Sequence, residues 1–157
     1  MKRVVVAAIA TLAVFSMAFV SCTQKKPAAA VPAFRVGLVT DIGGIDDKSF
    51  NQGTWEGIVR FAKEAGLKEG DYKYLQSKAE ADYIPNLSTF ADEKLDLIVA
   101  PGFLFEKAIS EVADKYPNTK LLLIDSVVTK PNVVSAVFAE HEGSFLVGVA
   151  AGLKAKA

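Results

Sequence analysis

Apolar and polar positions follow two different patterns along the chain from Phe34 onward. Short apolar runs predict strands at residues 35–40, 72–76, 95–100 and 120–125. Between them, apolar residues recur three or four positions apart, which predicts amphipathic helices. Because strands separated by helices of ten or more residues pair in parallel through right-handed crossovers, the pattern predicts an α/β fold with a doubly wound, mostly parallel sheet.

Each predicted helix has an apolar face that should pack on this sheet. The first helix should end at Gly66, a residue typical of helix C-termini. The second contains Pro85, which a helix tolerates only in its first turn. The three apolar faces comprise Trp55, Ile58, Val59 and Ala62; Ile84, Leu87 and Ala91; and Phe105, Ala108, Ile109, Val112, Ala113 and Tyr116. Since the third and fourth strands are almost continuously apolar, we expect helices on both faces of the sheet.

The C-terminal part of the sequence predicts a fifth strand and one more helix. Residues 133–138 form a strand-like run, but only about seven residues separate it from the fourth strand, which leaves its orientation open. Residues 140–157 begin a helix rich in small side chains, in which Phe145, Leu146 and Val149 would need a partner. We therefore expect the chain to be a truncated piece of a longer protein, or a missing remainder to pack here.

The first 21 residues have the pattern of an export signal. Two basic residues precede a 17-residue apolar segment, 4–20, and the only cysteine, Cys22, follows almost directly. This arrangement resembles the lipobox of bacterial lipoproteins, in which the thiol is acylated, although Phe19 and Val20 replace the usual leucine and small residue. The alternative is an uncleaved anchor with an unpaired cysteine. Both interpretations place the following domain outside the cytoplasm.

The remaining chain should consist of a flexible tether at residues 22–33 and a domain at residues 34–157, because the tether has two prolines and no apolar periodicity. Loss of the leader removes Lys2 and Arg3, so that 16 basic and 18 acidic side chains remain and the formal charge is −2. This charge argues against nucleic-acid binding and against a polybasic membrane patch. We expect membrane attachment through the N-terminal lipid alone.

Polar residues follow three of the predicted strands at the edge where an open α/β sheet binds its ligand. Asp41 follows the first strand, Gly102 lies just after the third, and Asp125 follows the fourth. Carboxylates accept paired hydrogen bonds from vicinal hydroxyls such as those of a sugar. The structural alternative is that each acid caps the helix or turn that follows it.

Two residues at the start of the first helix are further candidates for ligand contact. Phe50 is out of register with the apolar face of this helix and could stack on a planar base. A hydrophobic staple at the helix start is the alternative role. Asn51 has both a donor and an acceptor and could read a base edge or hold the loop.

Other chemistry is less well supported by the sequence. Gly43 and Gly44 lack the spacing of phosphate-binding loops, and neighbouring acids would repel a phosphate. Asp46 and Asp47 lack the alternating acids of a calcium loop, and one of them should lie near the following helix N-terminus. His141 is the only histidine. Because no nucleophile–base pair or metal-ligand cluster is identified, we expect no cofactor, no metal and no enzymatic activity.

The segments VTDIGGIDDKSFNQGTWEGI, LIVAPGF, LLLID and NVVSAVFAEHEGSFLVGVAAGLKAKA resemble the basic membrane protein family of bacterial substrate-binding lipoproteins, and within it the purine nucleoside receptor lipoproteins of spirochaetes. The resemblance extends from Phe34 to the end. It implies the first of two lobes of a type I periplasmic-binding-protein fold, which closes on a ligand and delivers it to an ABC transporter permease.

The resemblance also implies roles for individual residues. Family members stack a purine between one aromatic from each lobe and bind the ribose with carboxylates. Phe50 corresponds to the first-lobe aromatic, Asp41 and Asp125 to the carboxylates, Asn51 to a neighbouring amide, and Gly102 to the third-strand loop. Because the second lobe is absent from this sequence, the chain alone should bind weakly or not at all.

Three alternatives stay open at this point. A related fold could bind a sugar-like solute with the same acidic edge. A nucleoside-processing enzyme would require a base, a metal or a phosphate site in addition to the acids. A surface adhesin or antigen would require no ligand site.

Overall fold

A computed structural model of the protein describes residues 34–155. The predicted signal segment at 1–21, the acylated Cys22 and the tether at 22–33 lie outside the described residues.

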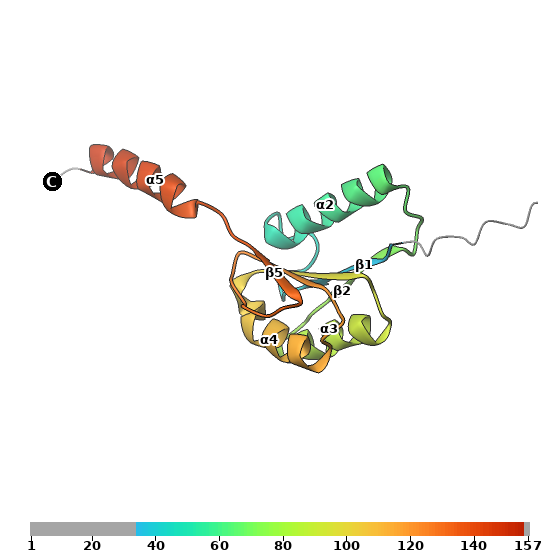
Figure 1. Cartoon of the computed structure of the whole chain (residues 1–157). Coiled ribbons are helices and arrows are strands. Elements are labelled where there is room, and N and C mark those ends of the chain that lie inside the picture. The colour runs from blue at the N-terminus through green and yellow to red at the C-terminus, as the bar shows by residue number, and fades with distance from the viewer. Residues whose placement is uncertain (1–33, 156–157) are drawn as a thin grey trace, which may run out of the picture. The chain divides into compact units, whose positions relative to one another are not determined.

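Five parallel strands form the sheet that Figure 1 shows between layers of helices. Their order is β2-β1-β3-β4-β5, and each of the four neighbouring pairs is parallel. The strands are β1 (Val36–Thr40), β2 (Tyr72–Gln76), β3 (Leu97–Pro101), β4 (Leu121–Ile124) and β5 (Val133–Ala136). The predicted α/β class and parallel sheet are therefore confirmed.

The fifth strand, whose orientation the sequence left open, pairs in parallel with β4. The connection between Ile124 and Val133 contains no helix. Eight residues can still return the chain, because β4 is four residues long and an extended chain spans about 3.3 Å per residue. Short strands thus allow a parallel pair without a helical crossover.

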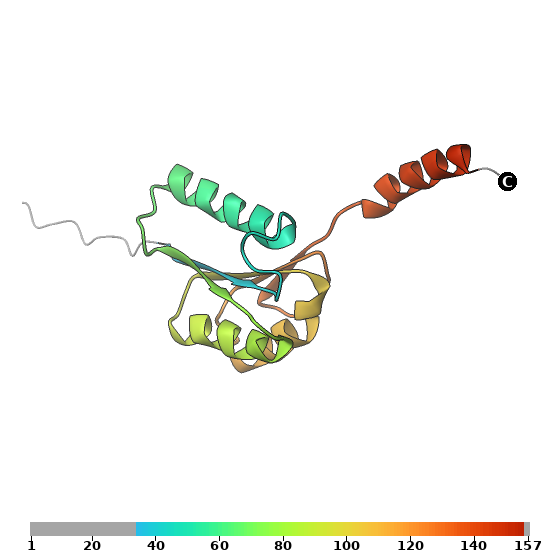
Figure 2. The ribbon, with the colours of Figure 1, turned by 180° about the vertical axis from the view of Figure 1, so that it is seen from behind.

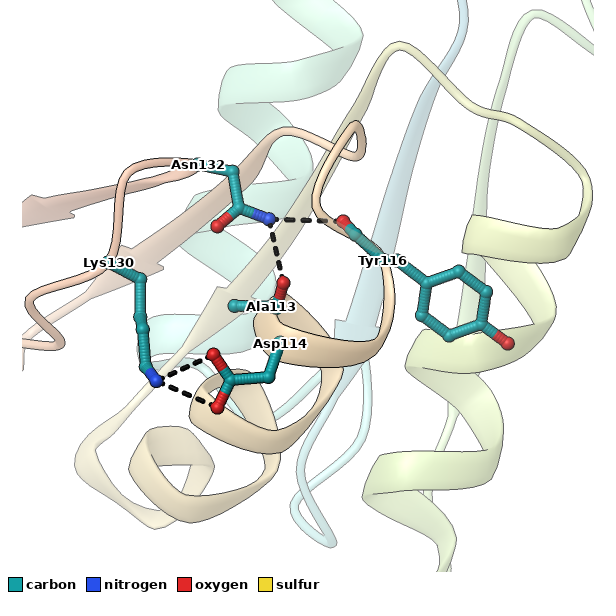
Figure 3. Close-up of polar contacts among 5 residues, drawn as sticks. All are labelled: Ala113, Asp114, Tyr116, Lys130 and Asn132. Atoms are coloured by element: carbon teal, nitrogen blue, oxygen red, sulfur yellow. Dashed lines mark hydrogen bonds and ion pairs between the residues drawn. The ribbon is translucent and has the colours of Figure 1, made fainter.

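The β4–β5 connection is fixed to the end of α4 (Glu106–Lys115), as Figure 3 shows. The Asn132 side-chain amide donates to the carbonyl oxygens of Ala113, Tyr116 and Thr119 at 3.2, 3.1 and 3.0 Å. Lys130 forms an ion pair with Asp114 at 2.7 Å. The asparagine thus bonds one carbonyl in the last turn of α4 and two in the segment that follows, and these contacts hold β5 next to β4.

Helices cover both faces of the sheet, as predicted. Figures 1 and 2 show α2 (Phe50–Ala65) on one face, and α3 (Tyr83–Asp92) with α4 on the other. Two short 3₁₀ turns, Glu80–Asp82 and Phe103–Phe105, precede α3 and α4. Helix α2 ends at Gly66 in the left-handed conformation with φ 70°, which confirms the predicted C-terminal glycine.

The apolar core lies mainly between the sheet and α3 and α4. Its largest fully buried side chains include Tyr83, Phe90 and Phe105. The apolar face predicted for α4 is confirmed, whereas the periodicity of α3 did not identify Tyr83 and Phe90 as core residues. Of the apolar face predicted for α2, only Ile58 and Ala62 are buried. Val59 is 37% exposed and does not belong to this face.

The last element, α5 (Glu140–Lys154), has no buried residue. Phe145 and Leu153 are 70% and 82% exposed. Within residues 34–155, none of the helices combines the length and the apolar character that a membrane span requires.

Candidate functional site

The neighbouring strands β1 and β3 define a switch point of the sheet. From β1 the chain proceeds to its neighbour β2 on one side, and β3 lies on the other side. Loops leave the carboxyl ends of β1 and β3 in opposite directions, and open α/β sheets bind ligands at such a point. The residues that follow each strand therefore form the candidate site.

Asp41, Gly102 and Asp125 directly follow β1, β3 and β4, which are adjacent in the sheet. The register pairs Leu38 with Val99 and Pro101 with Ile124. Because adjacent strands lie about 4.8 Å apart, the backbones of Asp41 and Asp125 are separated by roughly 10 Å along one rim. The structure thus brings the three predicted strand-end residues to the same edge.

The β1–α2 loop is organised around the Asn51 side chain, which is only 1% exposed. Its amide nitrogen donates to the carboxylates of Asp41 and Asp47, at 2.6 and 3.0 Å. Its oxygen accepts from the Asp41 backbone N–H at 3.2 Å. Both ends of the amide are therefore engaged within the loop, and they hold the Asp41 carboxylate in place.

Asp47 caps the start of α2. Its carboxylate accepts hydrogen bonds from the backbone N–H groups of Ser49, Asn51 and Gln52, at 2.8, 3.2 and 3.0 Å. Desolvation raises the pKa of Asp47, but these backbone hydrogen bonds and the Asn51 amide outweigh it, and the pKa lies below its ordinary value. The prediction that one of the two loop acids lies at the helix N-terminus is confirmed for Asp47.

Asp41 uses one carboxylate oxygen inside the loop and leaves the other without a partner among residues 34–155. Oδ1 accepts from Asn51 and from the backbone N–H of Gly43 at 2.8 Å. Burial raises the pKa of Tyr83 first of all, and the Asp41 charge raises it further, while a hydrogen bond with the Ile42 backbone opposes both. Tyr83 thus places a core side chain of α3 close to the rim.

Glycines set the shape of two rim loops. Gly44 has φ 77°, and a Cβ there would lie 2.5 Å from the Gln76 side-chain nitrogen. Gly102 has φ 103°; its N–H donates to the Ile124 carbonyl at 2.8 Å and its carbonyl accepts from Phe105 at 3.1 Å. Both positions disfavour any other residue, because positive φ strains an L side chain. The glycine pair at 43 and 44 thus serves the loop backbone.

Asp125 adopts the left-handed conformation with φ 66°, which aspartate tolerates better than most residues. Its backbone N–H donates to the Ala136 carbonyl at 2.7 Å. Its carboxylate is half-buried and makes no hydrogen bond to another residue in the described part of the chain. The next residue, Ser126, donates its hydroxyl to Glu106 at the start of α4.

Phe50 is the first residue of α2 and is 42% exposed. Its ring lies beside that of Phe138, with ring centres 6.3 Å apart and planes at 51°. Both rings line an apolar groove of about 830 Å³ that runs along α2 over Val99, Leu122 and Ile124 of the sheet. Phe50 therefore lies where the polar rim meets the apolar groove.

Sequence reasoning missed Phe103. Phe103 directly follows Gly102 on the same rim and is 64% exposed. The signal that could have found it is the apolar segment Phe103–Phe105, which follows the Pro-Gly at the end of the third strand. The sequence analysis placed only Phe105, on the apolar face of α4. An exposed aromatic at a strand end is a more informative feature than a buried one.

The chemistry of the rim is limited to carboxylates, amides and aromatic rings. Among residues 34–155, no group of three or more His, Cys, Asp and Glu side chains could hold a metal ion. His141, which the sequence gave no partner, lies on the exposed α5. The arrangement suits hydrogen bonding to hydroxyl groups and stacking on a planar ring.

Comparisons with known proteins agree with this architecture. The family described as "ABC transporter substrate-binding protein PnrA-like" matches residues 34–157. A "CD4+ T-cell-stimulating antigen" of Listeria monocytogenes is 44% identical over 126 residues, which cover 78% of this chain and 35% of that protein. An "ABC transporter nucleoside-binding protein BmpA" of Lactococcus lactis is 34% identical over 162 residues, or 99% of this chain and 46% of that protein.

Among solved structures, an ABC transporter solute-binding protein from Aeropyrum pernix superposes with a TM-score of 0.65 at 34% identity, covering 73% of this chain and 31% of that one. The matched region thus spans 31% to 46% of the length of these relatives. The match over residues 34–157 includes every strand and helix described above. The chain therefore belongs to the family of PnrA-like ABC transporter substrate-binding proteins.

Proposed function

We propose that this chain is the first lobe of a lipid-anchored solute-binding protein that delivers a purine nucleoside to an ABC transporter permease. The observation that carries the proposal is the rim, where Asp41 and Asp125 follow strands that flank β3 and where Phe50 opens α2. Two carboxylates and an aromatic ring match a ligand that has vicinal hydroxyls at one end and a planar base at the other. The Lactococcus lactis relative, whose name includes "nucleoside-binding", supports the same ligand class.

Each rim residue has a role in this proposal. Asp41, through its free oxygen, and Asp125 accept hydrogen bonds from the ribose hydroxyls, because a carboxylate has several lone-pair sites. Phe50 stacks on one face of the base. Asn51 acts mainly by holding the Asp41 carboxylate, and Gly102 lets the third-strand loop approach the ligand without a side chain.

The acidic side chains of the rim favour a nucleoside over a nucleotide. Three acidic side chains, Asp41, Asp47 and Asp125, lie at or beside the rim, and the nearby loops lack the spacing that cradles a phosphate. A phosphate group at this rim would be repelled, whereas a neutral nucleoside would not. We therefore assign the site to an uncharged ligand.

A second lobe is needed for tight binding in this proposal. A base that stacks on Phe50 has no stacking partner on its other face within this lobe. The relatives are more than twice as long as the matched region. A base held between two aromatic rings gains stacking on both faces. Acylation at Cys22 and the segment at 22–33 would hold the protein at the outer face of the membrane.

Calorimetric titration of the full-length gene product with inosine, guanosine and adenosine tests the proposal. We expect binding of at least one nucleoside, and no binding of the corresponding monophosphate. Absence of heat with all three nucleosides would remove the nucleoside assignment, and heat with free ribose would instead indicate a sugar-like solute. Release of free base during incubation would favour the enzyme alternative.

Replacement of the cysteine tests the anchor separately. A Cys22→Ser variant should lose both palmitate labelling and sedimentation with membranes while it keeps nucleoside binding. Unchanged membrane association of this variant would contradict lipid attachment and favour an uncleaved apolar anchor.

A further inference from the structure

Tyr83 is a buried side chain next to the rim whose hydroxyl group has no role in the proposed ligand contacts. It is the first residue of α3 and is only 2% exposed. A buried tyrosine usually places its hydroxyl on a hydrogen-bond partner, because an unpaired polar group inside a protein costs free energy. The partner of this hydroxyl therefore identifies the part of the rim to which Tyr83 is bound.

Packing against Phe105 fixes the Tyr83 ring. The two rings are stacked, with centres 4.2 Å apart and planes at 27°, and Phe105 is fully buried. Val39, near the end of β1, belongs to the same buried cluster. The backbone N–H of Phe105 donates to the Gly102 carbonyl at 3.1 Å. The Tyr83 ring is thus packed on the segment that follows β3.

The backbone at the start of α3 is fixed as well. Oδ2 of Asp82 accepts hydrogen bonds from the backbone N–H groups of Lys78 and Ala79, at 2.9 and 3.0 Å. This carboxylate closes the connection between β2 and α3 immediately before Tyr83. With its ring stacked and its backbone held, Tyr83 keeps its hydroxyl at a defined position.

The Tyr83 hydroxyl lies beside the β1–α2 loop and forms a hydrogen bond with the backbone of Ile42. Burial raises the pKa of Tyr83 most, and the charge of the neighbouring Asp41 raises it further, whereas this hydrogen bond lowers it. A hydrogen bond lowers the pKa of a phenol when the phenol oxygen accepts it. The Ile42 N–H is therefore the donor, and Tyr83 ties the residue after Asp41 to α3.

Ile42 has little else to hold it in place. Its side chain is 60% exposed, so packing on the core contributes little. On either side of it, Oδ1 of Asp41 accepts the Gly43 N–H at 2.8 Å and the Asn51 amide at 2.6 Å. Asn51 thus holds this segment from the side of α2, and Tyr83 holds it from the side of α3.

We propose that Tyr83 is a positioning residue of the candidate site: its hydroxyl binds the Ile42 N–H and thereby keeps the Asp41 carboxylate at the rim in the orientation that a ligand requires. A hydrogen bond to a core residue suits this purpose, because the core opens less readily than a surface loop. The ligand readout of this role rests on the proposed function, whereas the loop contact itself does not.

Tyr83→Phe removes the hydroxyl and keeps the ring on Phe105. In the ligand-free full-length gene product, the Ile42 amide should exchange its hydrogen about tenfold faster in this variant than in the parent, because it loses its acceptor. NMR of the isotope-labelled protein measures this rate. The matched control is Tyr116→Phe, which removes a hydroxyl that donates to Asp92 at 2.9 Å, at the end of α4 remote from the rim. The control should leave the Ile42 rate unchanged.

The Ser49 amide separates a local effect from general loosening of the loop. It donates to Oδ1 of Asp47 at 2.8 Å, in the same loop but next to the start of α2. Its exchange rate in Tyr83→Phe should stay within about twofold of the parent rate. An unchanged Ile42 rate would overturn the proposal. Equal acceleration at Ile42 and Ser49 would overturn it as well, since Tyr83 would then contribute only to the stability of the fold.

A double-mutant cycle on inosine binding tests whether Tyr83 acts through Asp41. In calorimetry of the full-length gene product, Tyr83→Phe should weaken binding about fivefold, the size expected for one hydrogen bond. In an Asp41→Asn background, the same substitution should change the affinity by less than about twofold, because the carboxylate that it positions is already lost. Equal losses in the two backgrounds would overturn the positioning role. Absence of inosine binding by the parent would reject the proposed ligand, and the Ile42 exchange rate would then decide the loop contact alone.

Discussion

The two faces of the sheet differ in how completely they are covered. The face under α3 and α4 has a cluster of 15 buried apolar residues, whereas the α2 face has a cluster of four. Five strands about 4.8 Å apart make a sheet roughly 24 Å wide, while one helix is about 10 Å across. A single helix therefore covers less than half of this sheet, and the groove is a consequence of width and not of a polar sequence.

Adjacent leucines of β4 test this difference most strongly. Leu123 belongs to the complete core and is fully buried, and Leu122 lines the groove on the opposite face. Leu123→Ala should lower the free energy of unfolding by about 2–5 kcal/mol, as expected for a large-to-small change in a packed core. Urea denaturation followed by circular dichroism measures it.

Leu122→Ala measures how well the open face is covered. Leu122 lines the groove and is half-buried, so its replacement should lower the free energy of unfolding by about 1 kcal/mol, less than Leu123→Ala. A cost equal to that of Leu123→Ala would mean that the two faces are covered equally well.

The next largest effect is expected where the open face meets the rim. Phe50→Ala in the full-length gene product should weaken nucleoside binding by about 1–3 kcal/mol, the range for loss of an aromatic that stacks on a base. Phe61→Ala is the control, because Phe61 lies on the same helix and lines the groove away from the rim. Calorimetry that finds equal affinities for the Phe50 variant and the parent would make Phe50 a groove residue alone.

On the face covered by α3 and α4, two substitutions in the β4–β5 connection compare the stability gained from hydrogen bonds with that gained from a surface ion pair. Asn132→Ala removes three hydrogen bonds to backbone carbonyls and should destabilise the protein by about 1–3 kcal/mol, because half-buried acceptors lose their donor. Lys130→Gln removes only an exposed ion pair and should cost about 0–1 kcal/mol. A larger loss from Lys130→Gln than from Asn132→Ala in thermal melts would reverse this ranking.

The smallest effect concerns the start of α2 and depends on pH. Asp47→Asn should cost about 1 kcal/mol at pH 7, as for loss of a helix cap. Since the folded-state pKa of Asp47 lies below its ordinary value of 3.8, the carboxylate stabilises the fold above that value. This contribution is lost as the pH falls through the folded pKa. Unfolding curves of parent and variant should converge below pH 3.8, and a constant difference down to pH 2 would contradict the assignment.

Much of the fold followed from periodicity alone. The third-helix pattern at Phe105, Ala108 and Ile109 is confirmed in full, because a face that packs on a sheet repeats every three to four residues. Tyr83 and Phe90 lie four residues before and three residues after Leu87, and they were missed because the predicted apolar face was started at Ile84, which is only partly buried. The prediction that Val59 is buried was wrong. No second helix lies beside α2 in the structure, so the side of α2 that carries Val59 stays exposed.

The candidate site was predictable in its strand-end residues and not in its contacts. Asp41 and Asp125 could be found because parallel strands end at one edge. The engagement of Asn51 with two carboxylates could not be predicted, since it depends on how the nine-residue loop at 41–49 folds back against the start of α2. Phe103 was missed because only the structure distinguishes it from the buried Phe105 two residues later.

The sequence by itself determined the parallel α/β class, the strand-end residues of the rim and the apolar character of α5, because these depend on local spacing and on the fixed polarity of parallel strands. Tertiary structure alone decided the orientation of β5, the hydrogen-bond partners of Asn51 and the groove beside α2. Each of these depends on distances between segments far apart in the chain, which no local pattern encodes.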